Sequence, residues 1–257
     1  MEQLLDPDGI LRSAQQGAGT ELIDASKSWA RLNEVTLDPV TLQRHHIVTQ
    51  TASPRSAPFD RLRTQVLHHM RASGQTRLAV TSAHKGAGSS TLVANLALSF
   101  ARQQDLRVLV FDFDLRAPSL VHLFGLEANS PRYTALMHHR RNFDSACLRV
   151  GKNLALSLNE TPAEDAAELL ASGKTTALLD HISRDFSPDL VLFDLPALHP
   201  MDDACAALAH ADCALLVAKA DQTRTAQIDT AERQIAERTT CLGVVLNQCR
   251  FAGGDHV

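Results

Sequence analysis

The feature that most constrains this chain is a small-residue turn, AHKGAGSST, placed between a short apolar strand and a helical run. The apolar strand is Leu78 to Thr81, and the helical run begins at Leu92. A strand, a Gly-rich loop and a helix in this order form the context of a phosphate-binding loop. In such a loop, backbone N–H groups and the helix N-terminus hold phosphate oxygens. The sequence therefore predicts an anion-binding strand–loop–helix unit.

The loop departs from the usual pattern G-x-x-x-x-G-K-[ST] at two places. Ala83 stands at the first glycine and Ser89 stands at the lysine, whereas Gly88 and Ser90 keep the second glycine and the hydroxyl. The hydroxyl that binds Mg²⁺ is thus retained, while the cation that contacts the β- and γ-phosphates is lost. Small-residue turns also precede helices in ordinary βα units, so this motif alone leaves both interpretations open.

Two apolar runs that end in carboxylates favour the nucleotide interpretation. The run Val108 to Phe111 ends in Asp112, with Asp114 two positions later, and the run DLVLFD ends in Asp194. Continuous apolar runs are typical of strands buried on both faces of a parallel sheet. Carboxylates at the ends of such strands can hold Mg²⁺ or accept a proton from a hydroxyl nucleophile. The alternative is that each carboxylate caps the next helix, but three strand-end sites in this order favour a shared site.

The alternation of strands and helices predicts the fold class. We expect strands near 77–81, 107–112, 153–158, 189–194, 212–218 and 241–246, and helices from 59 and near 91–104, 163–185, 202–210 and 223–237. Such alternation gives right-handed crossovers and a mostly parallel sheet with helices on both faces. The expected fold is therefore a P-loop NTPase-like, three-layer α/β/α arrangement, with ligands at the carboxyl ends of the strands.

The predicted organisation has three parts. Residues 1–56 form an irregular polar N-terminal segment, residues 57–250 form the nucleotide-binding domain, and residues 251–257 form a short C-terminal tail. Trp29 is the sole tryptophan. We expect it to anchor a short helix by packing into the protein core rather than to contact a partner.

Composition narrows the function classes. The formal net charge of −4 at pH 7 gives no general attraction to nucleic acid or anionic lipid. No apolar run approaches the length of a membrane span, and the acidic start MEQLLDPDG is not typical of a signal peptide. The five cysteines form no CxxC pair. We therefore expect a cytoplasmic protein.

Longer segments resemble the cytoplasmic kinase module of bacterial tyrosine kinases, which act in capsule and exopolysaccharide synthesis. The stretch VLVFDFDLRAPSLVHLFGL is similar to the family's second Walker segment, and DLVLFDLPALHPMDDA is similar to its Walker B. The ending LGVVLNQ resembles a family strand whose Asn, here Asn247, lies near the adenine. The resemblance covers residues 57–250 and places the chain in the deviant-Walker P-loop group, whose first Walker motif is here degenerate.

The resemblance implies ATP and Mg²⁺ as cofactors and assigns roles to residues. The implied nucleotide-binding residues are Lys85, Gly86, Ala87, Gly88, Ser89, Ser90, Thr91 and Asn247. The implied metal ligands are Ser90, Asp112 and Asp194, and the implied catalytic residues are Asp112, Asp114 and Asp194. Lys85 either reaches the phosphates from the other side of the loop or is a solvated residue of an exposed turn.

Three departures from the family pattern bear on activity. Ser89 replaces the lysine, Tyr133 is the only tyrosine, and the ring-forming E-x-x-R-x-x-R pattern reads Ala57, Asp60 and Arg63. We expect an ATP-binding member of the family that is weakly active or inactive as an autokinase. The sequence is compatible with a homo-oligomer but does not decide the oligomeric state. The resemblance implies a separate membrane polysaccharide co-polymerase or chain-length determinant protein as partner, through which the chain would lie at the periphery of the inner membrane. The alternatives are a non-catalytic adaptor of that co-polymerase and a partitioning-type ATPase, and the DLRAPSL segment favours the kinase family over the partitioning group.

Overall fold

The computed structural model describes residues 25–126, 143–199 and 202–249. Within these ranges the strands form one sheet in the order β1-β4-β5-β3-β6-β2-β7-β8. The strands are β1 (Asn33–Val35), β2 (Arg77–Ser82), β3 (Val108–Asp112), β4 (Leu148–Val150), β5 (Leu154–Ser157), β6 (Leu190–Asp194), β7 (Cys213–Lys219) and β8 (Thr240–Asn247). Every neighbouring pair is parallel except β4 with β5, so the mostly parallel sheet is confirmed.

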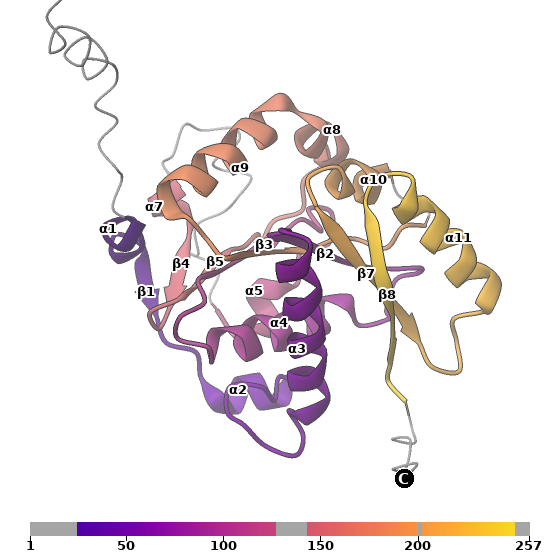
Figure 1. Ribbon diagram of the computed structural model, residues 1–257, viewed down its shortest axis with the longest axis horizontal. Coiled ribbons are helices and arrows are strands. Elements are labelled where there is room, and N and C mark those ends of the chain that lie inside the picture. The colour runs from indigo at the N-terminus through magenta and orange to yellow at the C-terminus, as the bar shows by residue number, and fades with distance from the viewer. Residues whose placement is uncertain (1–24, 127–142, 200–201, 250–257) are drawn as a thin grey trace, which may run out of the picture.

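Helices cover both faces of this sheet, as Figure 1 shows. One face carries α2 (Pro39–Arg44), α3 (Ala57–Ala72), α4 (Ser89–Ala101) and α5 (Leu120–Leu123). The other face carries α1 (Ala25–Ala30), α7 (Phe143–Ala146), α8 (Ala166–Ala171), α9 (Gly173–Phe186), α10 (Asp202–Leu208) and α11 (Thr225–Ala236). A separate cluster of buried apolar side chains fills each interface. The three-layer α/β/α fold is therefore confirmed.

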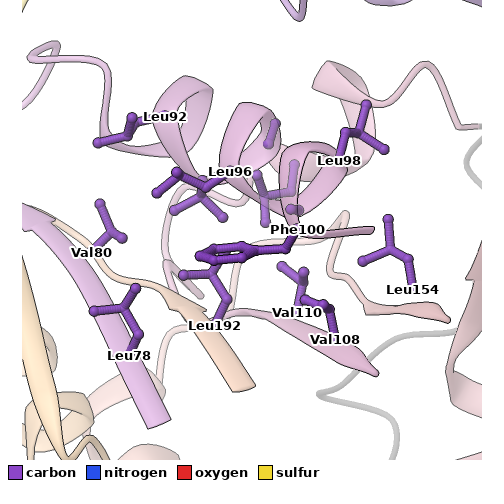
Figure 2. Close-up of a cluster of buried hydrophobic side chains, with 14 of the residues drawn as sticks. Leu78, Val80, Leu92, Leu96, Leu98, Phe100, Val108, Val110, Leu154 and Leu192 are labelled. Atoms are coloured by element: carbon purple, nitrogen blue, oxygen red, sulfur yellow. The ribbon is translucent and has the colours of Figure 1, made fainter. Parts of the chain in front are cut away.

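Helix α4 packs its apolar face on the central strands (Figure 2). Leu92, Leu96 and Phe100 recur at intervals of four and therefore lie on one side of the helix. They belong to the same buried cluster as Val80 of β2 and Leu192 of β6. This packing holds the N-terminus of α4 beside the carboxyl ends of β2 and β6, where the phosphate loop leads into the helix.

The described part of the N-terminal segment differs from the irregular structure that the sequence suggested. Residues 25–49 contribute α1, β1 and α2, and β1 extends the sheet by pairing with β4. Elements of three to six residues are too short to give a recognisable period, which is why the sequence pattern missed them.

Two buried side chains attach this segment to the rest of the domain. Trp29 is 3% exposed and donates its indole N–H to the Phe186 carbonyl at 2.7 Å, which confirms its expected core position. Asn95 of α4 donates to the His46 carbonyl at 3.1 Å and accepts from the Val48 N–H at 2.9 Å. The segment from residue 25 onward is therefore part of the domain that contains the phosphate loop.

The long helix expected over 163–185 is divided into α8 and α9. Ser172 separates them with an extended backbone, and its hydroxyl accepts the N–H of Lys174 at 3.2 Å as an N-cap. A serine inside an otherwise helical pattern competes for backbone hydrogen bonds and so begins a new helix here. Among the helices of the described ranges, none is both long and apolar enough to cross a bilayer.

Candidate nucleotide site

The phosphate loop takes a conformation that depends on two glycines. Gly86 has φ 84° and Gly88 has φ 90°, both in the left-handed region. Gly88 is the N-cap of α4, so the first N–H groups of the helix have no partner within it and point to the loop. A Cβ at Gly88 would lie 2.4 Å from Nδ2 of Asn247 and would displace that side chain, and the left-handed φ would strain any residue other than glycine.

Asp112 and Asp194 lie side by side at the carboxyl ends of β3 and β6. They are register partners in the parallel ladder, and both are fully buried. Side chains alternate along a strand, so the pair lies on the opposite face from Phe113 and Phe193, whose rings stack with centroids 4.9 Å apart. The carboxylates therefore face the layer of α4, whose N-terminus follows the phosphate loop.

Most oxygens of this acid pair have no hydrogen bond. Both carboxylate oxygens of Asp194 and Oδ1 of Asp112 are buried without a partner in the described ranges. Oδ2 of Asp112 accepts the N–H of Leu120 at 3.3 Å, at the start of α5. The capping alternative thus holds for one oxygen of Asp112 only. Burial of unpartnered carboxylates is costly unless a proton or a cation is present.

Burial also changes how the pair titrates. It raises the pKa of Asp112 to about 8, and the negative charge of Asp114 adds to the rise. Burial and the charge of Asp112 together raise the pKa of Asp194 well above its ordinary value. The Ser90 hydroxyl opposes the rise at Asp194, although it makes no hydrogen bond of ordinary geometry with either oxygen. Without a cation, the pair therefore retains a proton near neutral pH.

A cavity of about 260 Å³ opens beside the loop. Its lining includes six of the sequence-predicted site residues of the loop and helix start, and also Asp114: Lys85, Gly86, Gly88, Ser89, Ser90, Thr91 and Asp114. Asp112, Asp194, Ala87 and Asn247 are not part of the lining. Ser90 lines the cavity and also acts on Asp194, so it connects the open cavity with the buried pair.

Asp114 and Lys85 supply opposite charges at the wall of this cavity. Burial raises the pKa of Asp114, while the N–H of Ala117, which donates to Oδ1 at 3.2 Å, and the Lys85 ammonium oppose the rise. Lys85 is exposed. Its charge therefore reaches the site without being buried in it.

Two neighbouring charged or polar side chains have partners that the sequence did not predict. Arg116 forms an ion pair with Asp203, which is 2% exposed. The Arg116 guanidinium therefore balances a buried carboxylate of the protein itself. His84 contacts Thr223 Oγ1 through Nε2 at 2.7 Å and the Lys85 carbonyl through Nδ1 at 3.0 Å. Because Thr223 lies 139 residues away, no local pattern signals this contact.

Asn247 lies at the end of β8 and contacts the loop directly. Its side-chain Nδ2 donates to the Ala87 carbonyl at 2.9 Å. The contact fixes the loop against the strand, and the adenine contact that the resemblance implies stays a prediction.

Two carboxylates and a nearby hydroxyl form a donor set that fits Mg²⁺. The described ranges contain no group of three or more His, Cys, Asp or Glu side chains placed to hold a metal. Mg²⁺ is usually held by one or two carboxylates together with waters and phosphate oxygens. The orphaned oxygens of Asp112 and Asp194, with the Ser90 hydroxyl beside them, fit that pattern.

The fold and the loop are P-loop NTPase-like, and the comparisons agree. A family model described as "ParA: NUBPL iron-transfer P-loop NTPase" matches residues 74–154. The crystal structure of the chimerical protein CapA2B2 superposes with a TM-score of 0.72 at 23% identity, covering 85% of this chain and 93% of that one. The septum site-determining protein MinD of Pyrococcus horikoshii OT3, complexed with Mg-ADP, gives a TM-score of 0.55 at 17% identity, covering 66% and 69%. At these identities the likeness shows the fold.

Sequence relatives identify the family. The chain is 30% identical over 209 residues to the tyrosine-protein kinase YwqD of Bacillus subtilis (strain 168), covering 80% of this chain and 86% of that protein. It is 24% identical over 210 residues to the putative tyrosine-protein kinase CapB of Staphylococcus aureus, covering 81% and 90%. The chain belongs to the bacterial tyrosine-protein kinase family, which confirms the resemblance seen in its Walker segments.

Proposed function

We propose that this chain binds ATP with Mg²⁺ at the phosphate loop and works in exopolysaccharide or capsule biosynthesis and export. The observation that carries the proposal is the buried acid pair, Asp112 and Asp194, close to Ser90: both oxygens of Asp194 and Oδ1 of Asp112 have no hydrogen-bond partner in the described ranges. A purely structural role would leave such carboxylates hydrogen-bonded. A metal ion that also binds phosphate accounts for their burial and for their position.

In this proposal the loop and the acid pair have separate tasks. Backbone N–H groups from Gly86 to Thr91 bind the phosphates, with Lys85 adding charge from the exposed side of the loop. Ser90, Asp112 and Asp194 hold the metal, which would neutralise phosphate charge. Asp112 or Asp114 would accept the proton of a tyrosine hydroxyl. Asn247 would hold the loop in place and lie near the adenine.

We place the chain at the weakly active or inactive end of the family. Phosphoryl transfer depends mainly on positioning and charge neutralisation, so Ser89 in place of lysine removes a principal contribution. The Lys85 ammonium offers a partial replacement only, because it is exposed and also acts on Asp114. Tyr133, the sole tyrosine, lies outside the described residues.

The proposed setting is the cytoplasmic side of the inner membrane, at a separate polysaccharide co-polymerase. The chain is 28% identical over 241 residues to the succinoglycan biosynthesis transport protein ExoP of Rhizobium meliloti (strain 1021), and the match covers 28% of that longer protein. The segment similar to this chain is one part of a larger transport protein. We propose that this chain makes the corresponding association by docking on a separate membrane protein. A homo-oligomer is compatible with this arrangement.

A non-catalytic adaptor is the second candidate function, and one contact favours it. The Asn247 side chain occupies the space above Gly88 and bonds to the Ala87 carbonyl, so the loop is packed from one side. A loop that is packed and lacks its lysine suits a fold kept for docking rather than for catalysis.

Incubation of the purified protein with ATP and Mg²⁺ tests the proposal through ATP hydrolysis and intact mass. We expect slow hydrolysis and at most a trace of a singly phosphorylated form, because Tyr133 is the only acceptor tyrosine. Substantial modification of Tyr133 by the protein alone would contradict the degenerate-kinase assignment. If the protein binds no nucleotide at all, the non-catalytic adaptor function is the one supported.

A further inference from the structure

A second cavity lies at the opposite end of the sheet from the phosphate loop. It has a volume of about 290 Å³ and is lined by Ser26, Trp29, Ala30, Arg107, Arg149 and Lys152. Arg107 immediately precedes β3, whereas Asp112 ends that strand. Five residues of strand span about 16 Å, so this cavity is separate from the nucleotide site.

Three of the lining side chains are cationic, and one carboxylate pairs with them. Arg107 donates to the Ser26 hydroxyl at 2.8 Å, and Arg149 forms an ion pair with Glu34 at 2.8 Å. Within the described ranges Lys152 is exposed and forms no ion pair. The cavity therefore carries excess positive charge in a chain whose net charge is −4.

Side-chain hydrogen bonds position both guanidinium groups, that of Arg107 on the Ser26 hydroxyl and that of Arg149 on Glu34. The Arg107 backbone N–H donates to Asp189 at 2.7 Å, which fixes the start of β3, and Asp189 itself lines a different cavity. The Arg149 side chain is 16% exposed, and its Nε–H is buried with no acceptor in the described part of the chain. A buried guanidinium N–H without an acceptor is costly, so Arg149 keeps an unmet hydrogen-bonding requirement next to the cavity.

We infer that this cavity binds a phosphate group, carried either by a small molecule or by a lipid headgroup. Arginine presents several N–H donors in a plane that matches phosphate oxygens, and lysine adds a mobile charge at the rim. The volume is at the lower limit of small-molecule pockets, which suits one or two phosphate groups rather than a large ligand. The inference does not depend on nucleotide binding at the loop.

The sole tryptophan makes the site directly measurable. Trp29 lines the cavity, so its fluorescence reports a ligand that enters there. Titration of the full chain with inorganic pyrophosphate, at constant ionic strength, should give a saturable change. Loss of one charge-assisted contact in Lys152→Ala should weaken binding roughly 5- to 30-fold.

Two further variants make the test specific. Arg107→Ala should weaken pyrophosphate binding at least as much as Lys152→Ala, with thermal melting used to confirm that each variant is folded. Lys174→Ala, which removes an exposed lysine of α9 outside the cavity, should leave it unchanged. An equal loss in Lys174→Ala, or a signal that persists in Lys152→Ala and Arg107→Ala, would overturn the inference.

Vesicles distinguish the two sources of phosphate. Phosphatidylcholine vesicles containing phosphatidylglycerol should change Trp29 fluorescence if the ligand is a headgroup, and pyrophosphate should compete with them. A response to pyrophosphate without a response to vesicles assigns a soluble phosphate compound. No response to either probe would contradict the site.

Discussion

The phosphate loop and the acid pair meet at the same edge of the sheet, yet they retain different parts of the chemistry. The loop keeps the backbone geometry set by Gly86 and Gly88 but has Ser89 where a lysine would contact phosphate. The pair keeps both carboxylates, Asp112 and Asp194, in register and fully buried. The comparison shows that the carboxylates of the proposed metal-binding half are retained, while the proposed phosphate-binding half lacks the charge of a lysine.

The largest expected effect concerns the acid pair without metal, and it appears as a pH dependence of stability. Asp112 binds its proton more tightly in the folded state than in the unfolded state, because folding raises its pKa from 3.8 to about 8. The associated stability is therefore present below pH 3.8 and is lost as pH rises through about 8. At about 1.4 kcal/mol per unit, the loss is on the order of several kcal/mol.

Thermal melting from pH 5 to pH 8 without metal measures this effect. The melting temperature of the wild type should fall across this range, and saturating Mg²⁺ should reduce the fall. Asp112→Asn should flatten the pH profile, whereas Asp105→Asn, a change at an exposed carboxylate outside the site, should leave it as in the wild type. A flat wild-type profile would show that the pair is not strained.

The second effect concerns the loop and restores its missing charge. Ser89→Lys should place an ammonium against the phosphates and add charge-assisted hydrogen bonds worth roughly 1.5–3 kcal/mol. ATP with Mg²⁺ should then bind roughly 10- to 100-fold more tightly, and hydrolysis should increase as well. Calorimetric titration of the variant and the wild type checks the affinity. Unchanged affinity and turnover would mean that the loop does not hold phosphates.

The smallest effect concerns Lys85. Because this side chain is exposed and its charge also acts on Asp114, Lys85→Ala should weaken ATP binding only a few-fold. The same calorimetric titration measures it, with Lys174→Ala as the matched change at an exposed lysine. If Lys85→Ala abolishes binding and Ser89→Lys gains little, Lys85 has taken over the role of the missing lysine.

Much of the fold and the composition of the site followed from local patterns. Continuous apolar runs such as Val108 to Phe111 predicted the buried strands. The carboxylates that end them were expected to share a site, and Asp112 and Asp194 are neighbours in the sheet. The P-loop strand and helix were predicted by the same reasoning. These features depend on residues that are neighbours in sequence, which is why they can be read from it.

The rest depends on contacts between distant residues. The ion pair of Arg116 with Asp203 and the contact of His84 with Thr223 join segments 87 and 139 residues apart. The attachment of residues 46–49 to Asn95 is likewise a matter of tertiary packing. No periodicity predicts such pairs, so the sequence could place the carboxylates but not these contacts between distant side chains.

The most direct measurement of the central claim is calorimetric titration with ATP, with and without Mg²⁺, on the wild type and Asp194→Asn. If the intact metal-binding half governs the site, ATP should bind the wild type only when Mg²⁺ is present. Asp194→Asn should remove that dependence together with most of the binding, while melting at least as high as the wild type. Equal affinity with and without Mg²⁺, or unchanged binding in Asp194→Asn, would contradict the account.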